Sequence, residues 1–438
     1  MTDCTTTPIN LGRLGRKVIE AGFDGGDLST DAGLLLLKQV DKRLGLIDQV
    51  ASNLTDERVT GRCSYSIADL IRQRVFAIAQ GYEDLNDHGQ LRSDSLMRTA
   101  MGRTEAGASA PTLCRFENRW TREAALACSK VLVEQFIASF DDAPDELILD
   151  FDATDDAVHG NQEGKFFHGY YDHYCFLPLY VFCGDQLLVS YLRPSKIDGA
   201  KHAWAILKLL VMRLRERWPG VRITFRGDSG FCRHQMLNWC ERWDVDYIIG
   251  LSRNPRLEKY LAPTMAMAQD AYADSREKQR MFTDFDYGAK TWKRMRRVIG
   301  KAEVTVHGVN PRFVVTSLQG DAQKLYDQVY CARGDMENRI KEQQLGLFAD
   351  RTSAHKWWTN QCRLLLSSLA YVLIDTIRRL ALAGTQLARA QVGTIRLRLF
   401  KVAAAIMINS RRIRLYMPSH YPHQALWIKV SQRLLFSG

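Results

Sequence analysis

The spacing of apolar residues changes along the chain and predicts segments of different kinds. In residues 1–145 apolar side chains recur every three to four positions, which is the period of an amphipathic helix. Ser66 and Thr121 each stand directly before such a stretch and are suited to cap a helix, while Gly81 is suited to end one. We therefore expect residues 1–145 to be mainly helical.

Two of the expected helices meet near Trp120, one starting behind Ser109 and the other behind Thr121. Two short helices joined in this way are typical of the helix-turn-helix of DNA-binding proteins. They are also typical of ordinary helical bundles. Both interpretations stay open from the sequence.

From Leu147 onward the pattern changes to short runs rich in apolar, β-branched and aromatic residues, interrupted by two helical stretches. The expected strands are Leu147–Phe151, Cys175–Cys183, Gln186–Leu192, Val221–Arg226 and Asp246–Leu251, and the expected helices are Lys201–Arg217 and Arg233–Arg242. Three strands followed by helix, strand, helix and strand is the order of ribonuclease H-like folds. The predicted fold class is an α/β ribonuclease H-like catalytic domain, a mixed sheet flanked by helices, with a β-rich insertion and helical N- and C-terminal regions.

This pattern divides the chain into five expected segments. They are a mainly helical N-terminal DNA-binding region (1–145), the first part of the catalytic core (146–252), a β-rich insertion (253–324), the second part of the core (325–375) and a basic helical C-terminal region (376–438). We expect the last segment to contact DNA, a second copy of the chain, or both.

The expected insertion contains a basic stretch, residues 290–297, in which cations alternate with Trp292 and Met295. A cationic strand face is suited to DNA phosphates. It is equally typical of a solvated strand face over a small core, so both interpretations stay open. The residues that we predict to contact DNA here are Lys293, Arg294, Arg296 and Arg297.

The charge of the chain is concentrated near its C-terminal end. Net charge is +11, from 60 Lys and Arg against 49 Asp and Glu in 438 residues. Neither Asp nor Glu follows Asp375, and the cations after it are Arg378, Arg379, Arg389, Arg396, Arg398, Lys401, Arg411, Arg412, Arg414, Lys429 and Arg433. An excess of this kind favours a polyanionic partner. Because apolar residues are interspersed with the cations, we expect a folded region with a cationic face.

Cysteine usage and hydropathy bear on the compartment. Ten cysteines occur and no two form a C-x-x-C pair, which argues against a zinc site or a disulfide framework. The first residues lack the pattern of a secretory signal, and the most apolar run, Leu364–Ile374, is too short to span a membrane. We expect reduced thiols, no membrane partner and a cytoplasmic location.

Three carboxylates fall at the ends of expected elements or one turn inside them. Asp152 ends the first strand, Asp228 follows the strand Val221–Arg226, and Glu337 lies in a late helical run. In an open sheet the carboxyl ends of the strands form the edge where sites occur. Three converging carboxylates can hold two Mg²⁺ ions, which suit phosphodiester chemistry. We therefore predict Asp152, Asp228 and Glu337 as catalytic and metal-binding residues acting on DNA, with Mn²⁺ able to replace Mg²⁺.

Each of these acids has a rival or a second possible role. Asp150 lies on the same strand face as the first acid. Asp228 also fits the N-cap of the helix that follows it. Glu337 also fits a surface ion pair with Lys341 at the i+4 position, and Glu342 is a rival on another helix face.

Tyr330, Arg333 and Glu337 follow one another at spacings of three and four residues. They share one helix face if the helix extends back to Tyr330. A tyrosine and an arginine beside a catalytic acid suit contact with a phosphate and stacking on a base.

Together these features resemble the DDE transposases of bacterial insertion sequences, specifically the group 1 type with a β-rich insertion between the second Asp and the Glu. The resemblance spans essentially the whole chain. The residues that carry it are Leu149–Asp156 with His159 and Gly160, Gly169–Tyr171, Leu192–Pro194, Arg226–Phe231, Tyr330, Arg333 and Glu337, together with Gly81–Asp84, Asn86, Asp87, Ala110–Thr112 and Arg115–Asn118 in the N-terminal region.

The resemblance implies the roles of the site residues. Asp152, Asp228 and Glu337 would be the metal triad, and Tyr330 and Arg333 would contact the terminal phosphate or a displaced base. The family has a lysine seven residues after the Glu, where this chain has Gln344. Lys341 is the candidate to replace that lysine in contact with DNA.

The resemblance also implies a reaction and partners. The reaction would be nicking at terminal inverted repeats, followed by attack of a 3′-OH on target DNA. Relatives with the same Tyr-Arg-Glu arrangement cut the second strand through a DNA hairpin, which implies cut-and-paste transposition. The expected partners are double-stranded DNA and a second copy of the chain in a homodimer, at the nucleoid of a bacterial cell.

Two other functions are compatible with the sequence. One is a ribonuclease H-like DNA nuclease that does not transpose, such as a junction resolvase, although such an enzyme would not need the insertion. The other is a catalytically silent DNA-binding regulator derived from a transposase. The intact set of three acids argues against the regulator.

Overall fold

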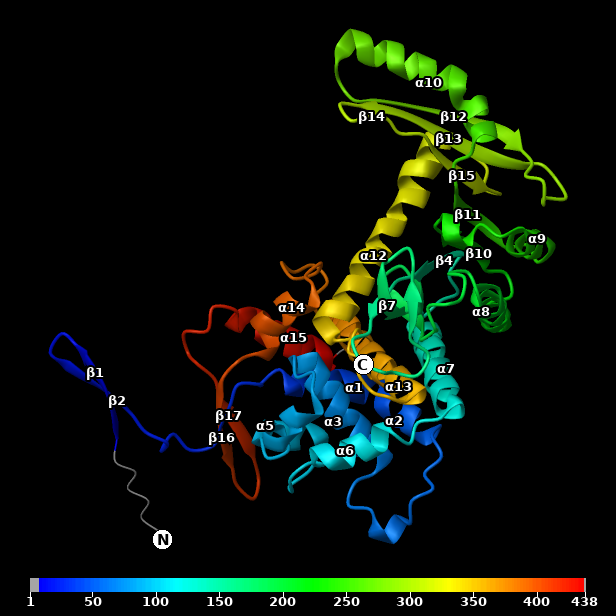
Figure 1. Ribbon diagram of the computed structural model, residues 1–438. Coiled ribbons are helices and arrows are strands. Elements are labelled where there is room, and N and C mark those ends of the chain that lie inside the picture. The colour runs from blue at the N-terminus through cyan, green and yellow to red at the C-terminus, as the bar shows by residue number, and fades with distance from the viewer. Residues whose placement is uncertain (1–7, 437–438) are drawn as a thin grey trace. The chain divides into compact units, whose positions relative to one another are not determined.

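The computed structural model describes residues 8–436 and divides into two compact units. Figure 1 draws and labels the helices and strands of the chain. Unit 1 comprises the chain up to Phe116 together with Leu373 onward, and unit 2 comprises Glu117–Val372. Among residues 8–436 there is no helix with the length and apolar character needed to cross a bilayer. The five-segment division stays a prediction, because a division into two units leaves its finer boundaries untested.

Unit 1 consists mostly of helices, with short antiparallel strands. Its helical segments are α1 (Leu34–Leu44), α2 (Leu46–Ser52), η1 (Thr60–Arg62), α3 (Ile67–Gln80), η2 (Leu85–Asp87), α4 (His88–Leu91), α5 (Ser95–Met101), α6 (Ala110–Glu117), η7 (Ile377–Ala381), α14 (Val392–Ile395), η8 (Arg396–Phe400) and α15 (Gln424–Phe436). Its strands are β1 (Ile9–Leu14) paired with β2 (Lys17–Ala21), and β3 (Leu28–Ser29), β16 (Ala404–Ile408) and β17 (Ile413–Tyr416) in a second sheet.

Segments from both parts of the sequence build unit 1 together. β3 pairs with β16, and the Lys401 ammonium lies 2.7 Å from the Asp31 carboxylate. The Gly33 N–H donates to the Phe400 carbonyl at 3.1 Å. A Cβ on Gly33 would lie 2.2 Å from the Phe400 Cα, so only glycine permits this approach. The N-terminal and C-terminal segments therefore fold as one unit.

The local helix signals in the sequence are confirmed. Ser66 forms a capping box at the start of α3, in which its hydroxyl accepts from the Asp69 N–H at 3.0 Å. Gly81 ends α3 with a φ of 96°. In unit 2 the Thr121 hydroxyl accepts from the Ala124 N–H at 3.3 Å at the start of α7 (Arg122–Ala138).

The basic C-terminal region is not wholly helical, contrary to the prediction. β16 and β17 form an antiparallel hairpin within it, with Ile406 opposite Leu415. The two strands are rich in residues that favour the extended conformation. The third strand of this sheet, β3, lies near the other end of the sequence, so the local sequence pattern does not predict the sheet.

Unit 2 alternates strands and helices. Besides α7, its helical segments are α8 (Ala203–Arg217), η3 (Ser229–Phe231), α9 (His234–Arg242), α10 (Pro255–Ser275), α11 (Ala322–Lys324), η4 (Leu325–Tyr330), η5 (Cys331–Arg333), α12 (Gly334–Lys341), η6 (Glu342–Gly346) and α13 (Trp357–Thr376). Its strands are β4 (Glu146–Ala153), β5 (Asp156–Ala157), β6 (Phe166–His168), β7 (His173–Phe176), β8 (Leu179–Cys183), β9 (Gln186–Tyr191), β10 (Arg222–Gly227), β11 (Asp246–Leu251), β12 (Gln279–Tyr287), β13 (Arg296–Thr305), β14 (Gly308–Val309) and β15 (Arg312–Thr316).

The main sheet of unit 2 has nine strands in the order β12-β13-β15-β11-β10-β4-β8-β9, with β14 paired to β13. β4, β10 and β11 are parallel to one another, and the other pairings are antiparallel. The predicted α/β class with a mixed sheet is confirmed. The single strand expected over residues 175–183 is two strands, β7 and β8. Pro178 separates them, and proline has no N–H for a strand ladder.

The segment after β11 extends the main sheet. β15 pairs antiparallel with β11, placing Val315 opposite Ile249, and β13 and β12 follow outward. α10 precedes these strands and packs on β12 and β13 (Figure 1). This long helix was not predicted in the β-rich insertion. The sequence did hold its start signals, because Asn254 caps it and Pro255 occupies its first turn.

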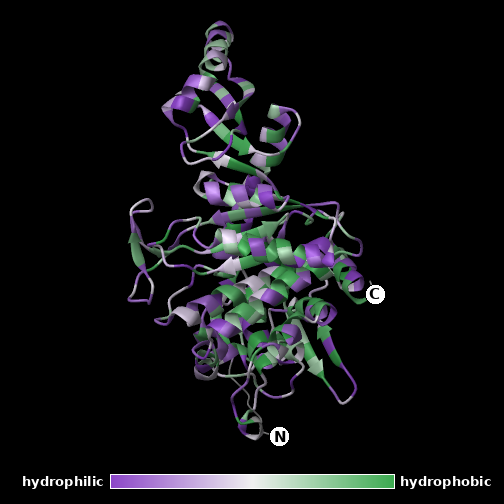
Figure 2. Cartoon of the chain, turned by 90° about the vertical axis from the view of Figure 1, so that its right-hand side faces the viewer, coloured by the Kyte–Doolittle hydropathy of each residue, from purple (hydrophilic) through white to green (hydrophobic). Residues whose placement is uncertain are grey.

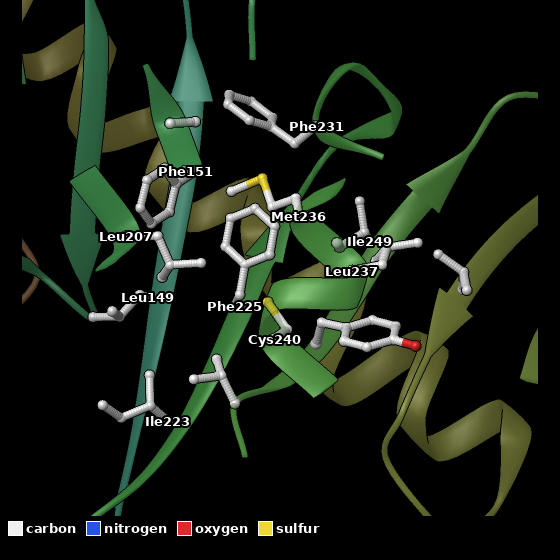
Figure 3. Packing of buried hydrophobic residues seen from close by; sticks show 14 of the residues in the cluster. Leu149, Phe151, Leu207, Ile223, Phe225, Phe231, Met236, Leu237, Cys240 and Ile249 are labelled. Carbon is white, nitrogen blue, oxygen red and sulfur yellow. The ribbon is translucent and has the colours of Figure 1, made fainter. Parts of the chain in front are cut away.

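The core of unit 2 includes the face of the sheet that carries Leu149 and Phe151. Figure 3 shows these side chains packed with Phe225 and Phe231, and the Phe151 and Phe225 rings meet edge to face with centroids 5.0 Å apart. Figure 2 shows the same concentration of hydrophobic residues along the strands of the sheet. Since side chains alternate along a strand, Asp150 and Asp152 project from the opposite face.

Leu214→Ala in α8 is expected to lower the free energy of unfolding by about 2–5 kcal/mol, because it leaves a cavity in the core. Leu209→Ala in the same helix is the matched control, because Leu209 is 67% exposed. We expect it to cost about 0.5 kcal/mol or less. Denaturant unfolding followed by circular dichroism measures both. Equal losses would contradict the assigned buried face of α8.

His88 makes the stability of unit 1 depend on pH. Its ring nitrogens lie 3.0 Å from Gln73 Nε2 and 3.2 Å from Arg74 Nη1. Burial, and then the Arg74 charge, lower the pKa of His88 from 6.5 to about 3. The folded protein thus keeps this imidazole neutral at pH values where the unfolded chain binds a proton.

The stabilising contribution of His88 should be fully present above pH 6.5 and lost as the pH falls toward about 3. The expected slope is about 1.4 kcal/mol per pH unit within that window. The measurement is the free energy of unfolding across the window, in the wild type and in His88→Gln. We expect the steeper loss in the wild type, and identical slopes would exclude this role.

Candidate active site

Asp152 and Asp228 extend from neighbouring parallel strands. In the register of β4 and β10, Phe151 stands opposite Gly227, so the next residues, Asp152 and Asp228, come side by side. Asp228 also caps the η3 turn, since its carboxylate accepts from the Gly230 N–H at 2.9 Å. The predicted placement of both acids at the carboxyl ends of strands is confirmed, and their catalytic role stays a prediction.

Glu337 lies in α12, within a helical stretch that runs from Ala322 to Gly346 through α, π and 3-10 segments. The helix therefore does extend back to Tyr330. Tyr330, Arg333 and Glu337 follow at helical spacing, and the charge of Arg333 interacts with both of the others.

The Arg333 guanidinium pairs with two of the three acids. Arg333 Nη2 donates to Glu337 Oε1 at 2.7 Å, and Nη1 lies 3.5 Å from Asp152 Oδ2. The negative charge of Asp228 also interacts with Arg333. Carboxylates placed close together repel one another, so a cation among them stabilises the arrangement.

The ionisation of Asp152 is perturbed by its surroundings. Burial raises the pKa of Asp152 from 3.8 to about 7; Arg333 opposes this rise, and the negative charges of Asp228 and Glu337 add to it. When a carboxyl group is buried beside two others, a nearby cation favours its ionised form. Perturbed groups of this kind cluster at functional sites.

A buried ion pair lies directly behind the strand-end acids. Arg226 Nη2 donates to Asp150 Oδ2 at 2.5 Å, and Arg226 Nε donates to the other carboxylate oxygen. Arg226 Nη1 donates to the Val329 carbonyl at 2.5 Å. The Arg226 side chain thereby joins β4, β10 and η4. Its contact in η4 is one residue before Tyr330, and Asp150 and Arg226 are each two residues before a strand-end acid.

Sequence reasoning treated Asp150 as a rival of Asp152 and missed this pairing. The structure gives Asp150 a different part, because it is buried and bonded to Arg226. A signal was available in the sequence. An acid and a cation stand two residues before Asp152 and Asp228, on strands expected to be parallel neighbours.

Gly250 in β11 makes room for the Tyr330 side chain. A Cβ on Gly250 would lie 2.6 Å from the Tyr330 hydroxyl and 2.8 Å from the Ser229 nitrogen. Burial raises the pKa of Tyr330, and the Arg333 charge moderates the rise. The hydroxyl is therefore a protonated donor, held against the turn that follows Asp228.

The other acids near β4 and α12 have partners of their own. Asp155 lies 2.9 Å from His173 Nε2, and Asp156 is buried and accepts from the Thr352 hydroxyl at 2.8 Å. Glu342, the predicted rival of Glu337, is buried and lies 3.4 Å from Arg339.

Lys341 and Gln344 lie on the C-terminal side of Glu337. Lys341 is exposed, and it is the residue predicted to contact DNA in place of the family lysine. Gln344 Nε2 donates to the Asp155 carbonyl at 3.0 Å, which ties η6 to the loop after β4. Gln344 is therefore held beside the loop that follows Asp152.

Arg296 is not accessible to DNA, which corrects the prediction for this residue. Its side chain is buried, with Nε donating to Glu241 Oε1 at 2.6 Å. Its guanidinium lies 4.9 Å from the centroid of the Trp292 ring. β13 begins at Arg296, and the strand alternation turns this side chain inward and the next one outward.

The other three cations of the predicted basic stretch lie nearer to solvent. Lys293 and Arg294 are exposed, and Arg294 is 3.0 Å from Glu241. Arg297 is partly buried and lies 2.7 Å from Asp284. Lys293 and Arg294 are therefore the members of this stretch best placed to reach a DNA backbone.

The three acids offer oxygen ligands, and hard cations such as Mg²⁺ prefer such ligands. Mutual repulsion of Asp152, Asp228 and Glu337 would be relieved by a bound cation. In the part of the chain that the structure describes, no three Asp, Glu, His or Cys side chains are grouped closely enough to hold one metal ion. The donor set fits a divalent metal by chemistry and by charge.

Comparison with known proteins places the chain in a family. Residues 11–437 match the family model for the transposase DDE domain, group 1. The chain belongs to this family of DDE transposases. The resemblance inferred from the sequence is thus confirmed at the level of the family.

No curated protein matches the sequence of this transposase. Among solved structures, it is similar to a cryo-EM structure of the piggyBac transposase synaptic complex with hairpin DNA, with a TM-score of 0.41 and 11% identity. That match covers 84% of this chain and 79% of the other.

Arg226→Gln is expected to destabilise the transposase by about 3–5 kcal/mol, because it leaves the Asp150 carboxylate buried without its partner. Arg222→Gln on the same strand is the matched control. The Arg222 side chain is 70% exposed and lies 3.9 Å from Glu146, so its loss should cost about 1 kcal/mol or less. Urea unfolding measures both variants. If Arg226→Gln costs no more than Arg222→Gln, the buried pair does not hold these elements together.

Proposed function

We propose that this transposase moves a bacterial insertion sequence by excising it and inserting it elsewhere. It would hydrolyse DNA at the terminal inverted repeats and join the resulting 3′-OH to target DNA. The observation that supports this proposal is the pairing of Arg333 with Asp152 and Glu337, where Asp228 stands beside Asp152 at the carboxyl edge of the sheet.

We further propose that the core is ribonuclease H-like. The strand order β9-β8-β4-β10-β11 supports this assignment, with two antiparallel pairings followed by two parallel ones. In such a sheet the candidate acids share the edge formed by the carboxyl ends of β4 and β10.

We assign Asp152, Asp228 and Glu337 as the ligands of two Mg²⁺ ions, which Mn²⁺ can replace. Bound there, the ions would supply the Lewis acidity that activates the attacking oxygen and stabilises the leaving one. The three carboxylates are carried by β4, the β10–η3 turn and α12, so the fold fixes their directions.

Arg333 and Tyr330 are the donors next to the acids. A guanidinium suits phosphate oxygens, and an aromatic ring suits a base. We assign both residues to the terminal phosphate or to a displaced base beside it. We assign Lys341, Lys293, Arg294 and Arg297 to the DNA backbone, where each phosphate contact would make binding more sensitive to salt.

The partners in this proposal are double-stranded DNA and a second copy of the chain. Transposition joins two element ends to one target, and each copy has one set of three acids. A homodimer on two inverted repeats would supply one catalytic centre for each end.

The test uses the purified protein, Mg²⁺ and a labelled duplex of the inverted repeat that flanks its coding region. We expect nicking at the end of the repeat. Asp228→Asn should lower the nicking rate on the order of a thousandfold, because losing a metal ligand removes several kcal/mol of transition-state stabilisation. The same variant should still bind the duplex. Asp270→Asn, at an exposed position of α10, is the matched control and should nick normally.

Two results would overturn the proposal. If the wild type binds the repeat without cutting it in Mg²⁺ or Mn²⁺, the protein is a silent DNA-binding regulator. If it cuts unrelated duplexes as efficiently as the repeat, it is a nuclease that lacks the end recognition of a transposase.

A further inference from the structure

A small hairpin near the candidate active site presents aromatic side chains to solvent. β6 and β7 pair antiparallel, with Phe167 opposite Tyr174. Both of these side chains are 51% exposed, and Tyr170 in the connecting turn is 85% exposed. Single exposed apolar residues are ordinary, but three large aromatic ones on one short hairpin indicate a binding surface.

The base of this hairpin is held in place. The Phe176 ring packs edge to face on Trp357, with centroids 5.3 Å apart. A Cβ on Gly164 would lie 2.5 Å from the Trp357 ring, and the Ser195 hydroxyl donates to the Phe166 carbonyl at 2.7 Å. Rings held on a fixed base lose little freedom when a ligand binds.

Cations accompany the aromatic rings. The Lys165 ammonium lies 5.1 Å from the centroid of Tyr174, and the Lys196 ammonium lies 4.3 Å from that of Phe166. The Phe167 and Tyr174 rings meet edge to face at 5.7 Å. Aromatic faces suit unpaired bases and ammonium groups suit phosphates, so the combination matches a single strand of nucleic acid.

The hairpin also lies close to the acids at the end of β4. His173 Nε2 is 2.9 Å from Asp155 Oδ2. Burial, and then the negative charges of Asp155 and Asp152, raise the pKa of Tyr171 to about 12. Tyr171 packs against Tyr170, with ring centroids 5.0 Å apart. The hairpin is therefore held beside the segment that follows Asp152, and a nucleotide stacked on it would lie next to that segment.

We propose that the hairpin of residues 166–176 is a stacking platform for unpaired bases of the DNA strand next to the cleaved phosphate. The inference rests on the proposed function and deepens it, because it adds a second holding point besides Tyr330 and Arg333. Paired bases expose only their edges, so a base must leave the duplex to stack here. The platform thus favours locally melted DNA over intact duplex.

The test measures the binding of fluorescein-labelled oligothymidylate and of a fully paired duplex by fluorescence anisotropy. Tyr170→Ala and Phe167→Ala should each weaken oligothymidylate binding about tenfold and leave duplex binding nearly unchanged. Tyr170→Phe keeps the ring and should bind normally. Since the side chains are exposed, the thermal unfolding midpoint should not move.

Trp243→Ala is the matched control. Trp243 is 50% exposed and stacks on Trp239, but it precedes the amino end of β11. Because β4, β10 and β11 are parallel, that end is the sheet edge opposite to Asp152. Its removal should leave oligothymidylate binding unchanged.

Normal oligothymidylate binding by both Tyr170→Ala and Phe167→Ala would overturn the platform. So would a shift in oligomeric state without a change in affinity, since the hairpin would then be a contact between copies. The nicking assay on the inverted-repeat duplex separates the two proposals. If the wild type nicks the repeat while the hairpin variants bind oligothymidylate normally, only the platform is ruled out. If the wild type does not nick but the variants lose oligothymidylate binding, only the proposed reaction is ruled out.

Discussion

The geometry of the candidate site depends on the buried pair between Arg226 and Asp150. A buried ion pair gains little net stability, because both charges lose their water. What this pair adds is position. With its third contact, to the Val329 carbonyl, the Arg226 guanidinium joins two strands to the helical stretch that carries Glu337. One planar group thereby links the two strands and the helical stretch that carry the three acids.

The helical stretch beyond Val329 completes this arrangement. Val329 lies in a π segment, η4, and a 3-10 segment, η5, follows before α12 begins. Irregular turns of this kind are frequent at functional sites. Here they bring Tyr330 against Gly250 and Arg333 among the acids. The helix is thus positioned by backbone contact at Gly250 and by charge at Arg333.

The sequence predicted the parts that depend on local signals. Strand order and alternation placed Asp152 and Asp228 at the sheet edge, and caps such as Ser66 marked helix starts. It failed where distant segments decide the outcome, as in the β16–β17 hairpin, whose partner β3 lies far away in the sequence. The predicted DNA contact of Arg296 was wrong for a different reason. Where a strand begins determines which residues face inward, and a shift by one residue exchanges the two faces.

The pairing of β15 with β11 has a consequence for how this fold can change. Gly250 stands opposite Val314 in that ladder, so the strand that contacts Tyr330 is an interior strand. Removal of the segment between β11 and α11 would leave β11 as a bare edge, with unpaired backbone groups beside Ile248 and Ile249. Such an edge is a template for aggregation between chains. The segment is therefore an integral part of the hydrogen-bonded sheet. A displacement of β15 would be transmitted through backbone hydrogen bonds to β11, and from Gly250 to the Tyr330 side chain beside the acids.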